Sequence, residues 1–134
     1  MYQFETNIRV RYAETDQMGF VYYGNYATYY EVTRVEALRS LGISYKILEE
    51  NGVLMPVLEN WSKYIRPAKY DDLLTIKLFL KEMPAMRITF EYEVFNEDKK
   101  LINLGSTTLV FLDKSSGKPI QVPGVVQDVL KPYF

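Results

Sequence analysis

The segment Ala13–Tyr26, AETDQMGFVYYGNY, places the carboxylate of Asp16 ahead of two glycines and a cluster of tyrosines. The chain has no histidine and no cysteine, which excludes nucleophiles that depend on a Ser-His-Asp triad or a Cys-His pair. A carboxylate can still activate a water molecule or attack a carbonyl carbon directly. Asp16 is therefore the candidate reactive group of this segment.

The glycines and tyrosines around Asp16 suit a site for a carbonyl substrate. A helix is predicted directly after them, and the free N–H groups at a helix N-terminus stabilise a developing oxyanion. Gly19 and Gly24 allow the backbone to approach a ligand closely, and Tyr22 offers an apolar wall with a polar tip. Such a site could cleave an ester or thioester. The alternative is that Asp16 only closes an Asx-turn, and the spacing alone favours that alternative.

Composition limits the other possibilities. The 134 residues, 48% hydrophobic and 25% charged, fit one domain with a packed core. The 16 basic and 17 acidic residues give a net charge of −1, so the broad positive field used by nonspecific nucleic-acid binding is missing. No signal-peptide pattern and no apolar run of roughly 18 residues is present. We expect a cytoplasmic protein without nucleic-acid binding or membrane insertion.

The expected elements begin with an alternating strand over residues 2–12. A helix over 26–41 follows, with Asn25 as its N-cap and a glycine after its end, and then a shorter helix over 44–50. The predicted apolar face of the long helix consists of Tyr26, Ala27, Tyr30, Ala37, Leu38 and Leu41. Four more strands are predicted at 53–65, 73–82, 86–96 and 101–112, before one or two helical turns near the C-terminus.

Short links between the later strands predict antiparallel pairing. A five-stranded sheet with one long helix that has a broad apolar face indicates an α+β fold in which the sheet curls around the helix. Such a small sheet has exposed edges, so we expect a dimer or a larger homo-oligomer.

Arg34 falls within the predicted apolar face of the long helix, where an unpaired charge is costly. We expect it to pair with Glu31, with Glu59 or with an acid across a subunit interface. Contact with a substrate is the alternative.

The segments VRYAETDQMGFVYYGNYATYYEVTRVEALRSLG (10–42) and YIRPAKYDDLLTI (64–76) resemble the signature of a known family. They are similar to hotdog-fold thioesterases of the 4-hydroxybenzoyl-CoA thioesterase-like type, which include the YbgC-like acyl-CoA thioesterases. The resemblance implies a single hotdog domain over 1–134 and hydrolysis of acyl-CoA thioesters without a metal or other cofactor. It also implies a dimer or dimer of dimers, with the site between two subunits.

The resemblance assigns roles to particular residues. Asp16 becomes the catalytic carboxylate, as general base or as nucleophile, and the backbone N–H of Tyr23 polarises the thioester carbonyl. Many relatives carry a histidine where this chain has Tyr23, so only the backbone role is carried over. The candidate substrate-binding residues are Gly19, Tyr22, Gly24, Asn25, Tyr26, Met55, Lys63, Arg66 and Lys69.

Lys63, Arg66 and Lys69 could bind the phosphates of coenzyme A. The alternative is that they keep a sheet edge basic against aggregation.

Two other functions are open to the same fold. A non-catalytic acyl-CoA-binding or sensing module would use the same pocket without releasing thiol. A hydratase or dehydratase is disfavoured, because such relatives usually rely on a histidine and this chain has none. The acyl group does not follow from the sequence.

Overall fold

The structure is a computed structural model that describes residues 1–134. Its strands are β1 (Tyr2–Arg9), β2 (Val53–Leu54), β3 (Val57–Tyr64), β4 (Leu73–Leu80), β5 (Arg87–Phe95), β6 (Leu101–Val110) and β7 (Leu112–Asp113). Its α-helices are α1 (Asn25–Ser40), α2 (Tyr45–Glu50) and α3 (Gly124–Leu130), and two short 3-10 helices span Tyr12–Glu14 and Lys131–Tyr133.

Five of the strands form one antiparallel sheet in the order β1-β4-β5-β6-β3. This confirms the predicted antiparallel pairing and the α+β class. Two predicted strands are each divided in the structure, because β2 and β7 pair with each other in a separate two-stranded sheet. The first strand ends at Arg9, and the prediction that it reaches Tyr12 is wrong: Tyr12 begins a 3-10 turn and is 78% exposed.

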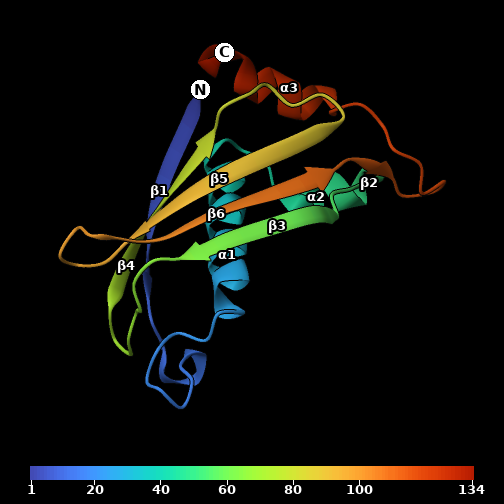
Figure 1. Ribbon diagram of the computed structural model, residues 1–134. Coiled ribbons are helices and arrows are strands. Elements are labelled where there is room, and N and C mark those ends of the chain that lie inside the picture. The colour runs from blue at the N-terminus through green and yellow to red at the C-terminus, as the bar shows by residue number, and fades with distance from the viewer.

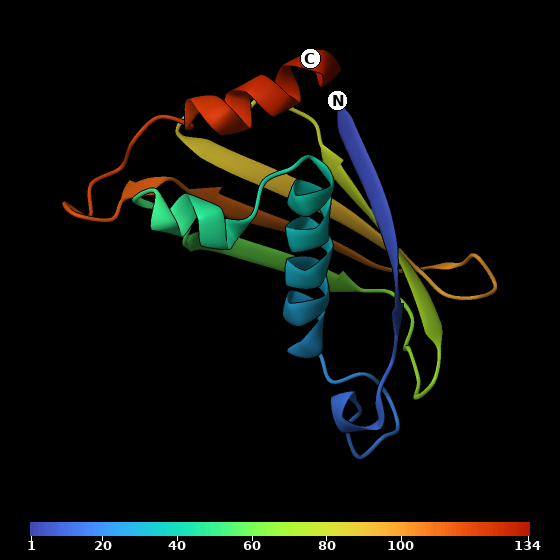
Figure 2. The same cartoon turned by 180° about the vertical axis from the view of Figure 1, so that it is seen from behind.

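The sheet curls around α1, which lies against its inner face (Figures 1 and 2). Alternate residues of β4 and β5 point inward and are fully buried, as the alternation of the sequence predicts. The buried face of α1 is broader than predicted and includes Tyr29 and Thr33. Ala27 was assigned to this face and is exposed instead, because the helix is rotated so that Tyr29 packs toward the loop that precedes it.

Tyr30 of α1 occupies the centre of the contact between helix and sheet. Its ring stacks on that of Tyr92, with centroids 4.2 Å apart and an interplanar angle of 4°. Its hydroxyl hydrogen bonds to Ser62 on β3 and to Asn103 on β6. A Cβ atom on Gly105 would collide with the Tyr30 ring, so the glycine is what lets the helix approach the sheet.

β3 forms one edge of the five-stranded sheet, and several of its large apolar side chains are exposed, including Leu58, Trp61 and Tyr64. The backbone N–H and C=O groups on the side of β3 away from β6 face no neighbouring strand in this chain. None of the helices has the length and hydrophobicity that a bilayer crossing requires.

Candidate active site

Asp16 lies in a tight loop that is closed by a bridge between Thr15 and Val21. Its Oδ1 atom accepts hydrogen bonds from the backbone N–H groups of Met18 (2.9 Å) and Phe20 (3.1 Å). Gly19 sits at the bend with φ +81°, where other residues would be strained. The Asx-turn alternative is therefore correct for one oxygen, while Oδ2 of Asp16 makes no hydrogen bond within the chain.

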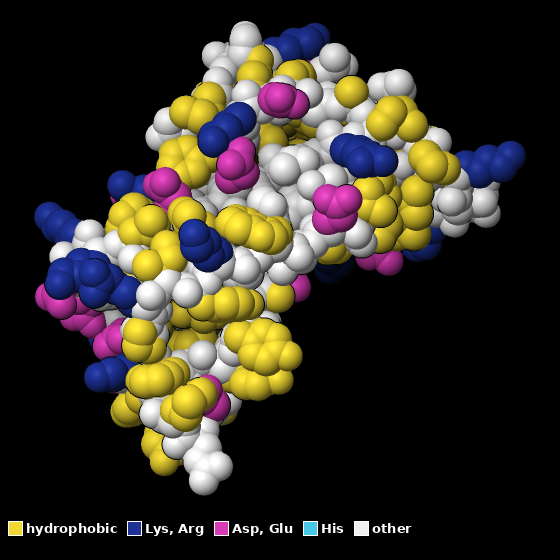
Figure 3. All heavy atoms as spheres, viewed as in Figure 1, with side chains coloured by type: hydrophobic (Ala, Val, Ile, Leu, Met, Phe, Trp, Pro, Cys, Tyr) yellow, Lys and Arg dark blue, Asp and Glu magenta, His cyan; other side chains and the backbone are white.

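Asp16 lines a largely apolar groove of about 370 Å³ together with Tyr23 and Tyr26. Tyr64 and Arg66, from the end of β3 and the segment after it, form another part of its lining. Figure 3 shows hydrophobic side chains gathered in the lower part of the view, where β3 ends and the loop before α1 lies. The fold thus brings four of the predicted site residues to one groove: Asp16, Tyr23, Tyr26 and Arg66.

Two backbone N–H groups at the N-terminus of α1 have no hydrogen-bond acceptor in the protein. The N–H groups of Tyr23 and Gly24 donate no hydrogen bond to the protein, whereas those of Asn25 and Tyr26 donate to Tyr22 and Tyr23 carbonyls. Gly24, not Asn25, precedes the first helical residue, so the predicted N-cap role of Asn25 is wrong. The side-chain amide of Asn25 instead donates to the backbone oxygen of Glu14 at 2.8 Å, which reaches back across the loop.

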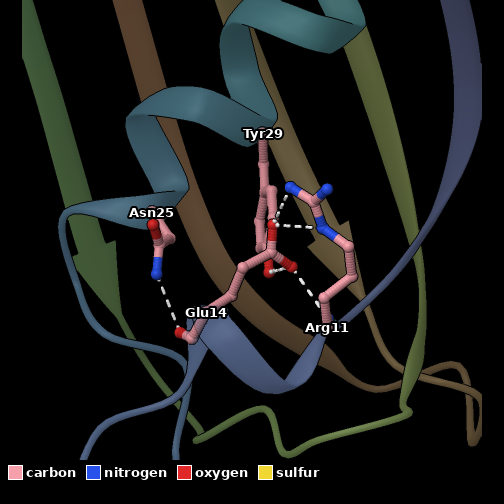
Figure 4. A network of polar contacts seen from close by, with 4 residues as sticks. All are labelled: Arg11, Glu14, Asn25 and Tyr29. Carbon is pink, nitrogen blue, oxygen red and sulfur yellow. Dashed lines mark hydrogen bonds and ion pairs between the residues drawn. The ribbon is translucent and has the colours of Figure 1, made fainter.

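Glu14 is a central residue of this region that the sequence analysis did not single out (Figure 4). The residue is 7% exposed, and its carboxylate accepts hydrogen bonds from the backbone N–H and guanidinium of Arg11 and from the Tyr29 hydroxyl. Its backbone oxygen accepts from the Tyr22 N–H and from Asn25. Glu14 therefore joins the end of the first strand, the Asp16 loop and the first turn of α1.

The environment of Glu14 favours the ionised carboxylate. Burial raises the pKa of the Glu14 carboxyl, but the hydrogen bonds from Arg11 and Tyr29 outweigh burial, so the pKa lies below its ordinary value. Burial and the same carboxylate raise the pKa of the Tyr29 hydroxyl, which remains a neutral donor. The sequence pointed to the role of Glu14 only through its position three residues after Arg11. Acid–base pairs with this spacing are common on protein surfaces, so the spacing does not identify a buried pair.

The three basic residues predicted to bind phosphates, Lys63, Arg66 and Lys69, do not line one common groove. Arg66 and Lys69 line a second groove of about 500 Å³, which Lys100 also lines and which contains the acids Asp72, Glu97 and Asp98. Arg66 lines both grooves, so it lies between them. Lys63 lines neither groove, because it points from β3 toward the outer face of the sheet, opposite Leu104.

Two predicted pocket residues lie outside the Asp16 groove. Tyr22 is 49% exposed and packs on the Tyr23 ring with centroids 4.7 Å apart. Met55 lies between β2 and β3, at the opposite end of β3 from Tyr64, and packs against the core. A role for Met55 in binding stays a prediction that would require a site shared by two chains.

Arg34 forms no salt bridge within the chain, so the expected pairing with its own Glu31 or Glu59 is wrong. No group of three or more acidic side chains is arranged to hold a metal ion, and the chain has no histidine or cysteine.

Residues 10–130 match the family described as the thioesterase-like superfamily, and the chain belongs to it. This confirms the resemblance noted in the sequence and the prediction that the chain is a thioesterase.

Particular relatives agree with this assignment. The acyl-CoA thioester hydrolase YbgC of Escherichia coli O157:H7 is 31% identical over 120 residues, which cover 90% of each chain. The crystal structure of a DHNA-CoA thioesterase from Staphylococcus aureus is 36% identical with a TM-score of 0.86, and the match covers 100% of this chain and 85% of that one. A 1,4-dihydroxy-2-naphthoyl-CoA thioesterase from Synechocystis, at 22% identity, has a TM-score of 0.91 over 97% of this chain and 96% of its own. The fold is therefore the hotdog fold, as predicted.

Proposed function

We propose that this chain hydrolyses acyl-CoA thioesters to a free acid and coenzyme A, with Asp16 as the reactive carboxylate. The observation that carries the proposal is the meeting of Asp16 and Tyr23 at one groove, where Oδ2 of Asp16 and the N–H of Tyr23 both lack partners in the protein. The relatives named as acyl-CoA thioester hydrolase and DHNA-CoA thioesterase support the choice of substrate class.

The thioester carbonyl would accept a hydrogen bond from the Tyr23 N–H, at the positive end of the 16-residue helix α1. In one route, Asp16 removes a proton from water while the water oxygen bonds to the carbonyl carbon. The tetrahedral intermediate then collapses, breaks the C–S bond and expels the thiolate, which takes up that proton. In the other, Asp16 attacks the carbon, expels the thiolate and forms a mixed anhydride, which water then hydrolyses.

The two grooves suggest how the substrate lies. The tyrosine-rich lining around Tyr23, Tyr26 and Tyr64 would contact the acyl group and the pantetheine arm. Arg66, between the grooves, and Lys69, beside it, would bind phosphates of the nucleotide part. Gly19 and Gly24 keep the backbone of the Asp16 loop and the helix start open to a ligand.

We also propose a homo-oligomer built on a dimer. The exposed edge of β3 carries unpaired backbone groups and the exposed apolar residues Leu58, Trp61 and Tyr64. An edge of this kind is stabilised by pairing with a second copy, which would continue the antiparallel sheet. The single domain over 1–134 and the cytoplasmic location stay predictions.

A non-catalytic acyl-CoA-binding module is the second candidate. It is favoured by one observation: the Asp16 carboxylate already has one oxygen committed to its own loop. Such a module would bind ligand without chemistry.

A thiol-trapping dye separates the two functions. The purified protein is mixed with acyl-CoAs of increasing chain length and with aryl-CoAs, and thiol release is followed with time. We expect catalytic release for at least one class. Saturable binding by calorimetry without release above the background would instead establish the binding module.

A further inference from the structure

Tyr26 is a buried residue in the first turn of α1 that lines the Asp16 groove. It is 3% exposed. Its ring makes edge-to-face contacts with the rings of Tyr29 and Tyr64, at centroid distances of 5.7 and 5.5 Å. Two aromatic neighbours thus fix the ring, and with the ring they fix the place of its hydroxyl.

The hydroxyl of Tyr26 makes no hydrogen bond within the chain, in contrast to those of three other buried tyrosines. The Tyr2 hydroxyl bonds to α1, the Tyr29 hydroxyl to Glu14 (Figure 4), and the Tyr30 hydroxyl to side chains of β3 and β6. Buried hydroxyls are normally hydrogen bonded, because an unpaired one has lost its water without a replacement. The partner of the Tyr26 hydroxyl must therefore come from outside the chain.

The Tyr26 hydroxyl opens into the groove and is not enclosed in the core. The enclosed side-chain polar atoms without a hydrogen-bond partner are Nε of Arg34 and the hydroxyls of Tyr45 and Tyr92. The oxygen of Tyr26 is not one of these atoms, and Tyr26 reaches the surface at the groove. Its hydroxyl therefore faces the space in which the substrate is proposed to lie.

The hydroxyl is a neutral hydrogen-bonding group on a largely apolar wall. Burial, Tyr64 and Asp72 raise the pKa of Tyr26 to about 12, so the hydroxyl keeps its proton at physiological pH and can donate it in a hydrogen bond. The apolar part of the lining is formed by Met18, Phe20, Val21, Ile65 and Pro67. A ligand atom that bonds to Tyr26 therefore finds a partner that this part of the wall does not offer.

The position of Tyr26 favours contact with the acyl end of the substrate. Side chains at the start of a helix lean toward its N-terminus, which directs Tyr26 back toward the turn that carries the Tyr23 N–H. The thioester carbonyl is proposed to lie at that N–H. The charged nucleotide is proposed to lie at Arg66 and Lys69, which are exposed. The nucleotide thus stays at the surface, and the buried wall formed by Tyr26 faces the acyl group.

We propose that Tyr26 is a specificity residue whose hydroxyl bonds to an oxygen of the acyl group. The protein then prefers acyl groups that carry a hydroxyl or keto oxygen over plain hydrocarbon acyl groups. This inference rests on the proposed function and names the class of acyl group that the same site takes. A hydrocarbon acyl group displaces water from the hydroxyl and leaves it unpaired, whereas an oxygen in the right place restores the hydrogen bond.

Tyr26→Phe tests the contact, because it removes the hydroxyl and keeps the ring. The hydroxyl has no partner in the chain, so the variant should keep wild-type stability in urea denaturation. The substrates are matched pairs: hydroxybutyryl-CoA with butyryl-CoA, and the hydroxybenzoyl-CoA isomers with benzoyl-CoA. In at least one pair, the ratio of kcat/KM for the oxygen-bearing member to that for the plain member should fall about tenfold.

The pair that responds shows whether the oxygen belongs to an aryl ring or to an aliphatic chain. An unchanged ratio in both pairs would overturn the proposal. An equal loss for both members of each pair would overturn it as well, because the hydroxyl would then act on the part of the substrate that all of them share.

Tyr12→Phe is the matched control. Tyr12 is 78% exposed, lines neither groove, and its hydroxyl likewise forms no hydrogen bond in the chain. This variant should leave every ratio at its wild-type value. Falls of equal size in the Tyr12→Phe and Tyr26→Phe variants would contradict a specific contact with Tyr26.

Binding measurements separate recognition from chemistry. The Asp16→Asn variant is expected to bind acyl-CoA without hydrolysing it, so calorimetry on this background gives Kd for each member of a pair, with and without Tyr26→Phe. Kd of the oxygen-bearing member should rise about tenfold when the hydroxyl is removed, and Kd of the plain member should change little. The cycle isolates the contact between the hydroxyl and the ligand oxygen.

The wild-type protein distinguishes the possible failures. A wild type that releases no thiol but binds oxygen-bearing acyl-CoA more tightly, with this preference lost in Tyr26→Phe, would refute hydrolysis and support the contact. A wild type that hydrolyses both members of every pair equally well would support hydrolysis and refute the contact. A wild type that neither binds nor hydrolyses any acyl-CoA would refute both.

Discussion

Asp16 and Tyr23 line the same groove, although the loop between them turns back on itself through a bridge from Thr15 to Val21. The loop fixes one oxygen of Asp16 by two backbone hydrogen bonds and leaves the other without a protein partner. A carboxylate held in this way is positioned without being neutralised, which is what a reaction at a bound carbonyl requires.

Asp16→Asn should abolish most of the activity without unfolding the protein. The asparagine Oδ1 can still accept from Met18 and Phe20, so the loop keeps its shape, but the side chain is no longer a base or a nucleophile. We expect kcat to fall by about 10³-fold or more with acyl-CoA affinity nearly unchanged. Thiol release and calorimetric binding measure the two quantities. Wild-type turnover in this variant would contradict the proposed mechanism.

Glu14→Ala should destabilise the fold through the contacts drawn in Figure 4. The change leaves the Tyr29 hydroxyl and the Arg11 backbone N–H without their acceptor, so the free energy of unfolding should fall by about 2–4 kcal/mol. Urea denaturation measures this difference. Glu36→Ala is the control, because its exposed ion pair with Arg39 contributes at most about 1 kcal/mol. Equal losses of unfolding free energy in the two variants would show that the Glu14 contacts stabilise the fold no more than an exposed ion pair does.

The contribution of Glu14 should depend on pH in a defined direction. Its pKa in the folded protein lies below the ordinary value, so ionised Glu14 contributes stability above the unfolded pKa of about 4.3. This contribution is lost as the pH falls through the lower, folded pKa. The stability difference between wild type and Glu14→Gln should therefore be constant from about pH 8 to pH 5 and shrink below about pH 4. A difference that grows on acidification would contradict the assignment.

Gly105→Ala should weaken the contact between α1 and the sheet. The added methyl group would collide with the Tyr30 ring, which cannot move away without losing its stacking on Tyr92. We expect a loss of about 2 kcal/mol or more in unfolding free energy, measured by thermal and urea denaturation. Gly124→Ala provides the comparison, since a Cβ there meets no atom within 4 Å. Equal stability of the two variants would mean that α1 and the Tyr30 ring can shift to accommodate the added methyl group without loss of stability.

Arg66→Gln should raise KM for acyl-CoA about tenfold and leave kcat nearly unchanged, because Arg66 is proposed to bind phosphate away from the reacting carbon. Acyl-pantetheine thioesters lack the nucleotide, so their KM should not respond. Lys63→Gln is a matched control that changes a lysine outside both grooves. A KM effect of Lys63→Gln equal to that of Arg66→Gln would restore the original three-residue phosphate site.

The sequence by itself determined the elements and the candidate acid. Strand alternation and helical periodicity depend on neighbours a few residues apart, so the five main strands and α1 could be predicted, and the short links predicted antiparallel pairing of the later strands. The Asp16 motif was recognisable because its residues are consecutive. Boundaries were less accurate, as at Tyr12, because a strand ends where its partner ends.

Only the tertiary structure decided which residues meet. Glu14 and Tyr29 are 15 positions apart, and the groove joins Asp16 to Arg66 through the end of β3. Lys63 and Arg66 are separated because Lys63 lies on β3 and faces the outer side of the sheet, whereas Arg66 lies in the segment after β3. That Arg34 forms no salt bridge appears only when every possible partner has been placed. These facts follow from packing between distant segments, which local periodicity does not specify, because the energy of a buried polar group depends on all of its neighbours in space.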